Sequence, residues 1–348
     1  MQDAFYKQLR IRQISEAVPG FKLFLFEDGH DIHYRSGQYL TFVRQLGKEE
    51  IRRSYSITSS PELGEPLSIG VKRIDNGFFS RELVDRARPG DVLLSIGAGG
   101  LFTLPDDLSP YESLFFLAAG SGITPVFPMI KTALHGHPRL SVILVYSNTK
   151  RADTIFLQEL EDLQIQFPGQ FRLILLFSTA ANLSMARLHR DRLLYFLQQF
   201  GSADQAKQLF YICGPESYMR MCTYTLQEAG IPPHLIRREN FIIERKTALL
   251  PAPPDKQTYV AQVKSASGTE NFRVDYPDSI LAAAKKQGIQ MPYSCEAGRC
   301  GSCVARLTSG KVWHAYNEVL TDAELAQGLV LTCVAHPVGG AVELTLGV

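Results

Sequence analysis

The chain is 348 residues long, a length that predicts two or three domains. Its composition, 45% hydrophobic and 20% charged with 27 Gly and 19 Pro, is that of a folded protein and excludes disordered, collagen-like and coiled-coil chains. The 36 Lys and Arg residues nearly balance the 35 Asp and Glu residues, so the formal net charge is +1. A near-neutral chain is poorly suited to neutralising phosphate backbones, and we therefore expect no nucleic-acid partner.

The sequence also predicts a cytoplasmic protein without a membrane span. The first 13 residues carry several charges and no continuous apolar core, which argues against a secretory signal there. No apolar run approaches the roughly 20 residues that cross a bilayer. The 6 cysteines are too few for a disulfide scaffold, so in a reducing compartment we expect thiols or metal ligands.

Residues 1–108 have the pattern of an antiparallel β-barrel. Short runs rich in β-branched and aromatic residues alternate with turns that contain Gly, Pro, Asp and Glu. The expected strands lie at 7–17, 21–28, 37–45, 52–60, 66–74 and 91–99, with one helix at 79–87.

From residue 109 to residue 243 the pattern changes to alternating strands and helices. Almost continuously apolar runs, typical of strands buried on both faces, lie at 112–120, 140–147, 171–179, 208–214 and 235–243. Helical stretches lie between them at 125–134, 155–167, 190–200 and 216–228. This alternation predicts an α/β domain with a doubly wound parallel sheet.

A proline-rich segment, 244–257, separates this domain from the last one. Its clustered prolines favour a stiff, extended linker. Residues 258–348 then contain strand-like runs at 258–266, 271–277 and 304–312, a helix at 279–287, a loop rich in cysteine and a closing pair of strands.

Four cysteines of the last domain have an informative spacing. Cys295, Cys300 and Cys303 form a C-x4-C-x2-C motif, and Cys333 follows after 29 residues. Two irons bridged by two sulfides need four converging thiolates, and the small residues of this loop let the backbone wrap around such a cluster. The alternatives are a zinc knuckle and unrelated buried thiols, although zinc sites usually contain two CxxC-type pairs.

This motif resembles that of plant-type 2Fe-2S ferredoxins. The resemblance covers residues 258–348 and includes the residues before the first cysteine, Pro292-Tyr293-Ser294, and before the last, Leu331-Thr332. It implies an α+β domain with the β-grasp ferredoxin fold, whose metal ligands are the four cysteines.

A second motif lies at the end of a predicted barrel strand, Arg53-Ser54-Tyr55-Ser56, and a related one, Gly77-Phe78-Phe79-Ser80, opens the predicted helix. A flavin needs an aromatic face beside its ring system, a hydroxyl near N5, and cationic or amide donors for its pyrophosphate. Tyr55, Ser56 and Arg53 offer these groups in that order. For the first tetrapeptide alone, an ordinary amphipathic strand explains the pattern equally well.

Together these motifs resemble the flavin site of the ferredoxin-NADP reductase superfamily. The resemblance implies that FAD is bound by Arg53, Ser54, Tyr55, Ser56, Val71, Lys72, Gly77, Phe79 and Ser80. Ser56 is then expected to orient the flavin for hydride transfer without ionising.

A glycine-rich turn, Gly120-Ser121-Gly122-Ile123-Thr124-Pro125, follows the first strand of the second domain and precedes a helix. Glycines let the backbone approach a pyrophosphate, and a helix N-terminus presents free amides to it. At the far end of the same predicted sheet, Cys213-Gly214-Pro215 follows another strand. By itself the first turn is a weak signal, and a buried small hydrophobe explains Cys213 equally well.

Both turns resemble the nicotinamide site of the same superfamily. The resemblance implies that NAD(P)H is bound by Gly120, Gly122, Ile123, Thr124, Pro125, Cys213, Gly214 and Pro215, with Phe241 on the nicotinamide side of the flavin. The candidate catalytic residues are then Ser56, Cys213 and Glu239.

A basic pair, Lys150 and Arg151, follows the second strand of this domain. A 2′-phosphate needs Lys or Arg at this place, whereas an unphosphorylated ribose needs a carboxylate. The pair favours NADPH over NADH, although basic residues are common on any surface.

The domain order resembles that of the reductase components of multicomponent oxygenases, hydroxylases and desaturases. A nicotinamide donates two electrons as a hydride, a 2Fe-2S cluster accepts one at a time, and a flavin can do both. We therefore predict an NAD(P)H-dependent oxidoreductase that passes electrons through FAD and a 2Fe-2S cluster to an oxygenase, hydroxylase or desaturase partner. We expect this partner to dock near the cluster, around Tyr293, Glu296 and Arg299.

Two alternatives remain open. The chain could be the electron-transfer subunit of a larger dehydrogenase, but in such subunits the cysteine segment is short, whereas here Cys333 lies inside a complete ferredoxin-like domain. It could also be a ferredoxin-type carrier with a non-functional flavin region, which would show no flavin absorbance and oxidise no NAD(P)H.

Overall fold

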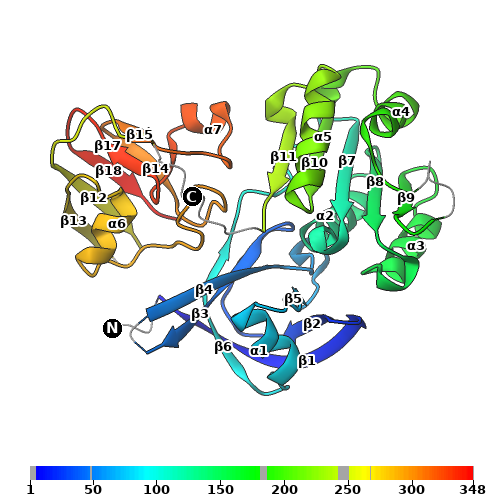
Figure 1. Cartoon of the computed structure of the whole chain (residues 1–348), viewed down its shortest axis with the longest axis horizontal. Helices are drawn as coiled ribbons and strands as arrows, with labels where there is room; N and C mark the ends of the chain where they lie inside the picture. Colours follow the sequence, from blue (N-terminus) through cyan, green and yellow to red (C-terminus); the bar gives the residue numbers. More distant parts are fainter. Residues whose placement is uncertain (1–4, 48, 181–185, 242–250, 267, 348) are drawn as a thin grey trace. The chain divides into compact units, whose positions relative to one another are not determined.

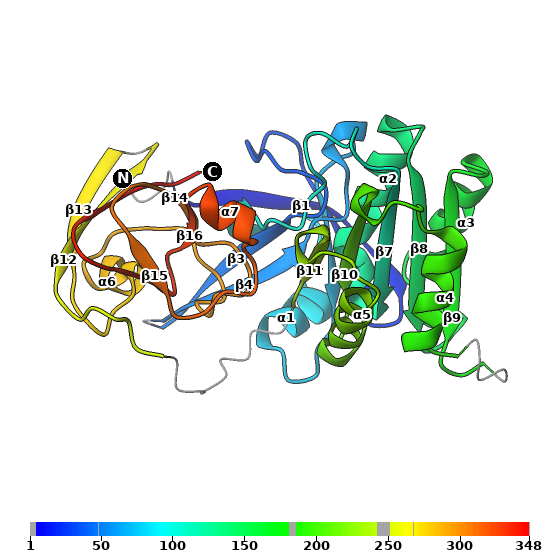
Figure 2. The same ribbon diagram turned by 90° about the horizontal axis from the view of Figure 1, so that it is seen from above.

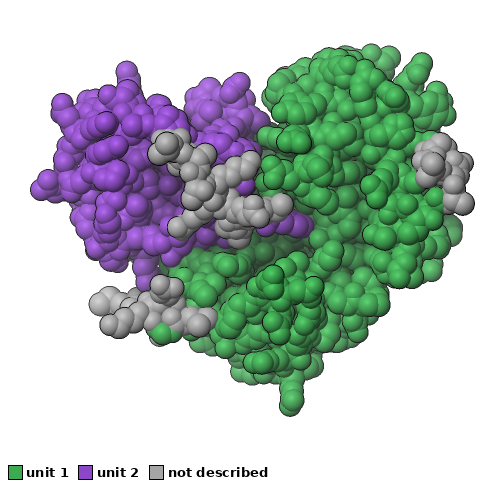
Figure 3. Space-filling view, viewed as in Figure 1, with its two compact units in different colours: residues 1–240 green, residues 241–348 purple. Residues whose placement is uncertain are grey.

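The computed structural model of the chain describes residues 5–47, 49–180, 186–241, 251–266 and 268–347. The chain divides into two compact units, Met1–Asn240 and Phe241–Val348 (Figure 3). The first unit contains an antiparallel and a parallel sheet, and the second contains the cysteine motif (Figure 1).

The antiparallel sheet of the first unit has six strands in the order β4-β3-β6-β1-β2-β5. Its elements are β1 (Lys7–Val18), β2 (Phe21–Phe26), β3 (Tyr39–Leu46), β4 (Glu49–Ser56), the 3-10 turn η1 (Pro61–Leu63), β5 (Ser68–Lys72), α1 (Phe78–Arg86) and β6 (Val92–Gly99). Along β1, Leu9 and Ile11 are fully buried while their neighbours are exposed, because alternate side chains point inward. A bridge between Ile57 and Ile69 joins the end of β4 to β5, so the sheet curves into a barrel.

The parallel sheet has five strands in the order β11-β10-β7-β8-β9. Helix α2 packs against β7, β8 and β10, α3 packs against β9, and α5 packs against β10 and α4 (Figure 2). Because helices cover the sheet, β8 and β10 are buried along most of their length. The elements are β7 (Ser113–Ala119), η2 (Gly120–Gly122), α2 (Ile123–Gly136), β8 (Ser141–Asn148), η3 (Arg151–Asp153), α3 (Leu157–Gln166), β9 (Phe171–Phe177), α4 (Arg190–Phe200), η5 (Gln205–Lys207), β10 (Gln208–Cys213), α5 (Glu216–Glu228), η6 (Pro233–Leu235) and β11 (Ile236–Glu239).

The strand order reverses between β7 and β10. The chain continues from β7 to β8 and β9 on one side, and later adds β10 and β11 on the other side. In doubly wound sheets, ligands bind at the carboxyl ends of the strands where the order reverses. The turns that follow β7 and β10 both lie at this place.

The second unit contains a mixed five-stranded sheet, in the order β13-β12-β18-β14-β16, and the two-stranded pair β15-β17. Strand β12 pairs antiparallel with β13 and parallel with β18, as in a β-grasp domain. The Ser279 side chain accepts a hydrogen bond of 3.2 Å from the Ala282 N–H and so caps α6. The elements are β12 (Tyr259–Ser265), β13 (Gly268–Val274), α6 (Ile280–Lys286), β14 (Val304–Ser309), β15 (Val312–His314), α7 (Asp322–Ala326), β16 (Leu329–Leu331), β17 (Ala335–Pro337) and β18 (Val342–Thr345).

The predicted fold class is confirmed by the antiparallel barrel sheet, the parallel sheet and the mixed sheet of the second unit. Helix α7 was not predicted, although a capping box between Thr321 and Glu324 marks its start. The predicted strand at 235–243 ends earlier, at Glu239. Of the predicted linker, 244–250 lies outside the described residues, and 251–257 contains no helix or strand. No helix in the described part of the chain combines the length and the apolar character that crossing a bilayer requires.

Candidate functional site

The two turns predicted to bind nicotinamide are in direct contact. They were predicted to lie at opposite ends of the sheet, but β7 and β10 are hydrogen-bonded neighbours with Ala118 opposite Cys213. A side chain at Gly122 would overlap the carbonyl group of Cys213 and lie 2.9 Å from the backbone nitrogen of Gly214. The turns approach each other this closely because position 122 has no side chain.

A buried tyrosine holds the first of these turns. The hydroxyl of Tyr146, on β8, donates a hydrogen bond of 3.0 Å to the carbonyl oxygen of Gly120. The C=O and N–H of a trans peptide point in opposite directions, so this bond directs the N–H of Ser121 away from Tyr146. An amide oriented in this way at a helix N-terminus is a donor for an anionic pyrophosphate. Tyr146 was not predicted as a site residue, because in the sequence it looks like any tyrosine of a buried strand.

We expect Tyr146→Phe to weaken NAD(P)H binding about fivefold, because the ring still packs while the hydrogen bond of about 1 kcal/mol is lost. Titration of the flavin absorbance with the coenzyme measures the dissociation constant. Tyr211→Phe is the matched control, since that buried hydroxyl donates a 3.0 Å bond to the carbonyl of Thr103 instead. Equal dissociation constants for the two variants would contradict the role of Tyr146.

Cys213 and Glu239 lie side by side on β10 and β11. Cys213 is fully buried, and Glu239 is 8% exposed. Burial raises the pKa of the Cys213 thiol well above its usual value, and the nearby Glu239 carboxylate raises it further. The thiol therefore stays protonated at neutral pH, so it offers a small contact surface and not a nucleophile.

The other residues predicted to bind the nicotinamide nucleotide lie at the starts of α2 and α5, except Phe241. Ile123, Thr124 and Pro125 form the buried first turn of α2, and the Thr124 hydroxyl donates a 2.9 Å bond to the carbonyl of Ser121. Pro215 is the N-cap of α5. Phe241, by contrast, is 42% exposed and falls at the start of the second unit, outside the unit that contains both turns.

The predicted flavin motif ends β4, an edge strand of the barrel sheet. The ring centroid of Tyr55 lies 6.1 Å from that of Phe79 and 6.2 Å from that of Phe42. Burial raises the pKa of Tyr55, so its hydroxyl stays neutral. Ser56 is buried, whereas Arg53 is exposed. The strand thus presents a packed aromatic ring and a buried hydroxyl next to an exposed cation.

Three other predicted flavin residues lie before and in the first turn of α1. Gly77 is the N-cap of this helix. The hydroxyl of Ser80 accepts a 3.2 Å bond from the Ile74 N–H and donates a 3.3 Å bond to the carbonyl of Gly77. Phe79 is buried in the barrel. The Ser80 side chain therefore closes the turn before the helix, while the helix amides remain the candidate donors for a pyrophosphate.

Strand β5 joins the flavin motif to the nicotinamide turns. Its residue Val71 is buried, and the next residue, Lys72, is exposed. The bridge from Ile57 to β5 places the residue after Ser56 beside this strand. A side chain at Gly70, also on β5, would lie 2.9 Å from Cγ2 of Thr124. The end of β4 and the start of α2 therefore both contact β5, which suits a flavin stacked against a nicotinamide.

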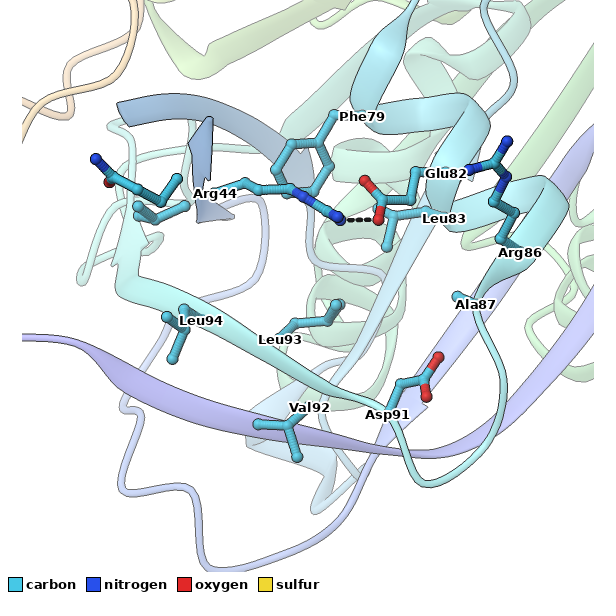
Figure 4. Close-up of a pocket in the computed structure, with 12 residues that line it drawn as sticks. Arg44, Phe79, Glu82, Leu83, Arg86, Ala87, Asp91, Val92, Leu93 and Leu94 are labelled. Atoms are coloured by element: carbon cyan, nitrogen blue, oxygen red, sulfur yellow. Dashed lines mark ion pairs between the residues drawn. The ribbon is translucent and has the colours of Figure 1, made fainter. Parts of the chain in front are cut away.

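A pocket of about 520 Å³ lies at one end of the barrel between β3, α1 and β6 (Figure 4). Arg44 forms an ion pair with Glu82 there, and Phe79 and Leu83 supply apolar lining. Phe79 is the one predicted flavin residue among those that line it, so this pocket is distinct from the end of β4.

The basic pair after β8 is exposed and already bound to carboxylates. Lys150 Nζ lies 3.6 Å from Asp153, and Arg151 Nη2 lies 2.6 Å from Glu161. Exposed ion pairs are worth about 0–1 kcal/mol, so either side chain can exchange its carboxylate for a phosphate.

The four cysteine sulfurs converge in the second unit. The backbone N–H groups of Cys295 and Ala297 point at the sulfurs of Cys300 and Cys295, at 3.5 Å and 3.4 Å. The Cys295 sulfur also interacts with the thiols of Cys300 and Cys333, and Cys333 interacts with Cys303. The cysteines thus lie close together although 29 residues separate Cys333 from the motif.

The charges of this donor set fit an iron–sulfur cluster. Hydrogen bonds from neighbouring thiols lower the pKa of Cys295, and the same contacts raise the pKa of Cys300 and Cys333. Ionising all four thiols requires compensating positive charge, which iron supplies to soft sulfur ligands. Within the described ranges, no group of three or more His, Cys, Asp or Glu side chains is arranged so that it could hold a metal ion. A 2Fe-2S cluster would be held by four thiolates, two on each iron.

Two of the three residues around which a partner was expected to dock are buried. Tyr293 is 9% exposed and Arg299 is 8% exposed, so these two side chains offer little surface, and docking of a partner near the cluster stays a prediction. Glu296 is partly exposed and forms a 2.9 Å ion pair with Lys285.

The fold and these sites define a modular oxidoreductase with a flavin domain, a nicotinamide domain and an iron–sulfur domain. Residues 8–103 match the oxidoreductase FAD-binding domain, 116–223 the oxidoreductase NAD-binding domain and 263–338 the 2Fe-2S iron-sulfur cluster binding domain. The chain belongs to the ferredoxin-NADP reductase-like family of oxidoreductases that carry a C-terminal 2Fe-2S ferredoxin domain.

Two relatives and one solved structure cover most of the chain. The chain is 32% identical to a subunit of 1,2-phenylacetyl-CoA epoxidase from Escherichia coli (strain K12), over 87% of this chain and 86% of that protein. It is 31% identical to the ferredoxin reductase component of 3-ketosteroid-9-alpha-monooxygenase from Mycolicibacterium smegmatis, over 90% of this chain and 87% of that protein. The structure of phthalate dioxygenase reductase shares the fold, with a TM-score of 0.59, 24% identity and 99% coverage of both chains.

These matches confirm the predicted resemblance and the predicted cofactors, which are FAD, NAD(P)H and a 2Fe-2S cluster. The roles of individual residues and the domain boundaries stay predictions.

Proposed function

We propose that this chain is the reductase component of an oxygenase system, and that its electron acceptor is an oxygenase, hydroxylase or desaturase. The observation that carries the proposal is the presence, in one chain, of four converging cysteines and of two touching turns that are predicted to bind the nicotinamide nucleotide. The names of relatives that share its length, one from an epoxidase and one from a monooxygenase, support this acceptor class. Bound FAD supplies the exchange between hydride and single electrons.

The protein's own residues contribute alignment. Gly122 and Cys213 bring the two turns together, and Thr124 lies against the barrel strand that contacts the end of β4. Ser56 orients the flavin edge from that end. Proximity and orientation account for large rate effects in such transfers, so no residue has to act as a strong base.

A visible spectrum of the purified protein, followed by anaerobic titration with NADH and NADPH separately, tests the proposal. We expect flavin and iron–sulfur absorbance that the coenzyme bleaches, together with acid-labile sulfide. Protein purified without oxygen that lacks the sulfide would contradict the proposal. Protein without flavin colour would favour the ferredoxin-type carrier.

Ser56→Ala is expected to slow flavin reduction about tenfold, the effect of losing one orienting hydrogen bond of about 1.4 kcal/mol. Stopped-flow reduction by NADPH measures the rate, and the cluster content should be unchanged. Ser95→Ala is the control, because that buried barrel hydroxyl donates a 3.0 Å bond to the carbonyl of Thr41 on β3. Reduction of the Ser56 variant at the wild-type rate would remove Ser56 from the mechanism.

We further propose that Lys150 and Arg151 favour NADPH by contacting its 2′-phosphate. The double variant Lys150→Gln/Arg151→Gln is then expected to lower kcat/KM for NADPH about tenfold, from one or two lost charge-assisted bonds, and to leave NADH little affected. Arg172→Gln, an exposed change on β9, is the control. A variant in which both coenzymes change by the same factor would show that the pair does not select between them.

We also propose a cytoplasmic location. Cys213 and Cys222 lie outside the cluster motif as buried free thiols, which suits a reducing compartment. Cell fractionation followed by detection of the native protein tests this.

A further inference from the structure

We propose that Arg299 raises the reduction potential of the 2Fe-2S cluster, and that Glu318 both positions Arg299 and opposes its effect. The inference rests on the proposed function, because it concerns the cluster that the four cysteines hold. Neither residue is one of the four predicted cluster ligands. From the sequence, Arg299 was expected only to lie near the place where a partner docks.

Arg299 is a buried cation inside the cysteine loop. It directly precedes Cys300, its backbone N–H interacts with the sulfur of Cys295, and its side chain is 5% exposed. A buried guanidinium is costly unless other groups compensate its charge. The Nε atom lies 3.4 Å from Oε2 of Glu318, and Cζ lies 5.7 Å from the ring centroid of Tyr316. The Tyr316 hydroxyl donates to the other carboxylate oxygen of Glu318.

The segment that supplies these partners contacts both parts of the chain that carry cysteine ligands. The Glu318 N–H donates a 3.1 Å bond to the carbonyl of Gly298, within the cysteine loop. The Ala315 N–H donates a 2.9 Å bond to the carbonyl of Val334, the residue after Cys333. The Arg299–Glu318 pair is therefore anchored to the polypeptide that surrounds the sulfurs.

The charges of the pair have opposite effects on the cluster. Reduction adds one electron, and therefore one negative charge, to the cluster. A buried cation stabilises this reduced form and raises the potential, while a buried carboxylate lowers it. Solvent and salt screen an exposed charge much more than a buried one. Lys285, whose side chain is 36% exposed and paired with Glu296 in the same loop, should therefore have a smaller effect.

Redox titration of the full-length protein, followed by electron paramagnetic resonance, tests the inference. In Arg299→Met we expect the ratio of reduced to oxidised cluster at a fixed potential to fall about tenfold. This change is equivalent to a reduction potential about 59 mV lower for a one-electron couple. Glu318→Gln should shift the potential upward. Arg299→Lys, which keeps the charge, should stay near the wild type, and Lys285→Met should shift less than Arg299→Met.

Opposite shifts for Arg299→Met and Glu318→Gln support the inference, because loss of a merely structural contact would shift both variants in the same direction. Shifts of the same sign, or no shift in either variant, would overturn it. If Arg299→Met does not retain its cluster, the sign for Glu318→Gln decides: an upward shift supports the inference, and any other result overturns it. A wild-type protein without a cluster signal would instead refute the proposed function, and with it this inference.

Discussion

Gly122→Ala is expected to reduce kcat/KM for reduction of the flavin by NAD(P)H at least about 100-fold, or about 2.7 kcal/mol in transition-state stabilisation. The added methyl group would overlap the carbonyl of Cys213, so the turn after β7 must move away from the turn after β10. A displacement of this kind changes the orientation of the nicotinamide as well as its affinity. Flavin content should stay near the wild-type value, because the flavin motif lies on the barrel.

The control for this change is Gly136→Ala, at the other end of the same helix. A side chain there meets nothing within 4 Å, and we expect normal reduction rates. Stopped-flow absorbance with NADH and with NADPH measures both variants. Wild-type rates in Gly122→Ala would show that the contact between the two turns is not needed for coenzyme binding.

Cys333→Ser is expected to remove the cluster, and with it electron transfer beyond the flavin, while reduction of the flavin by NAD(P)H is kept. Cytochrome c reduction should fall about 100-fold because a hydroxyl is a poor ligand for iron, whereas ferricyanide reduction, which the flavin can support directly, should stay within about twofold. Iron and acid-labile sulfide assays should show the loss. Parallel loss of both activities would mean that the cluster is required for the flavin domain to fold or react.

Cys222→Ser provides the matched control. This thiol is buried in α5, far along the sequence from the cysteine motif, and serine is nearly isosteric with cysteine. We expect normal iron content and normal rates with both acceptors. Loss of iron from this variant would indicate that the iron assay detects general instability.

Several elements of the fold could be predicted because their signals are local. The apolar runs of β7, β8 and β10 show strands buried on both faces, and the alternation along β1 shows a strand with one buried face. Helix α7 was missed because it is only five residues long. The strands β15 and β17 are three residues each, and pairing with a distant segment stabilises them.

The sequence by itself determined the chemistry of this protein. The cysteine spacing and the glycine-rich turns specify which cofactors the chain can bind, because ligand type and backbone freedom are properties of the residues themselves. Only the tertiary structure decided which of these residues meet. In the structure β10 pairs with β7, Tyr146 donates a hydrogen bond to Gly120, and the buried Arg299 forms an ion pair with Glu318. Such contacts join residues that are far apart along the chain, and no local pattern of side chains encodes them.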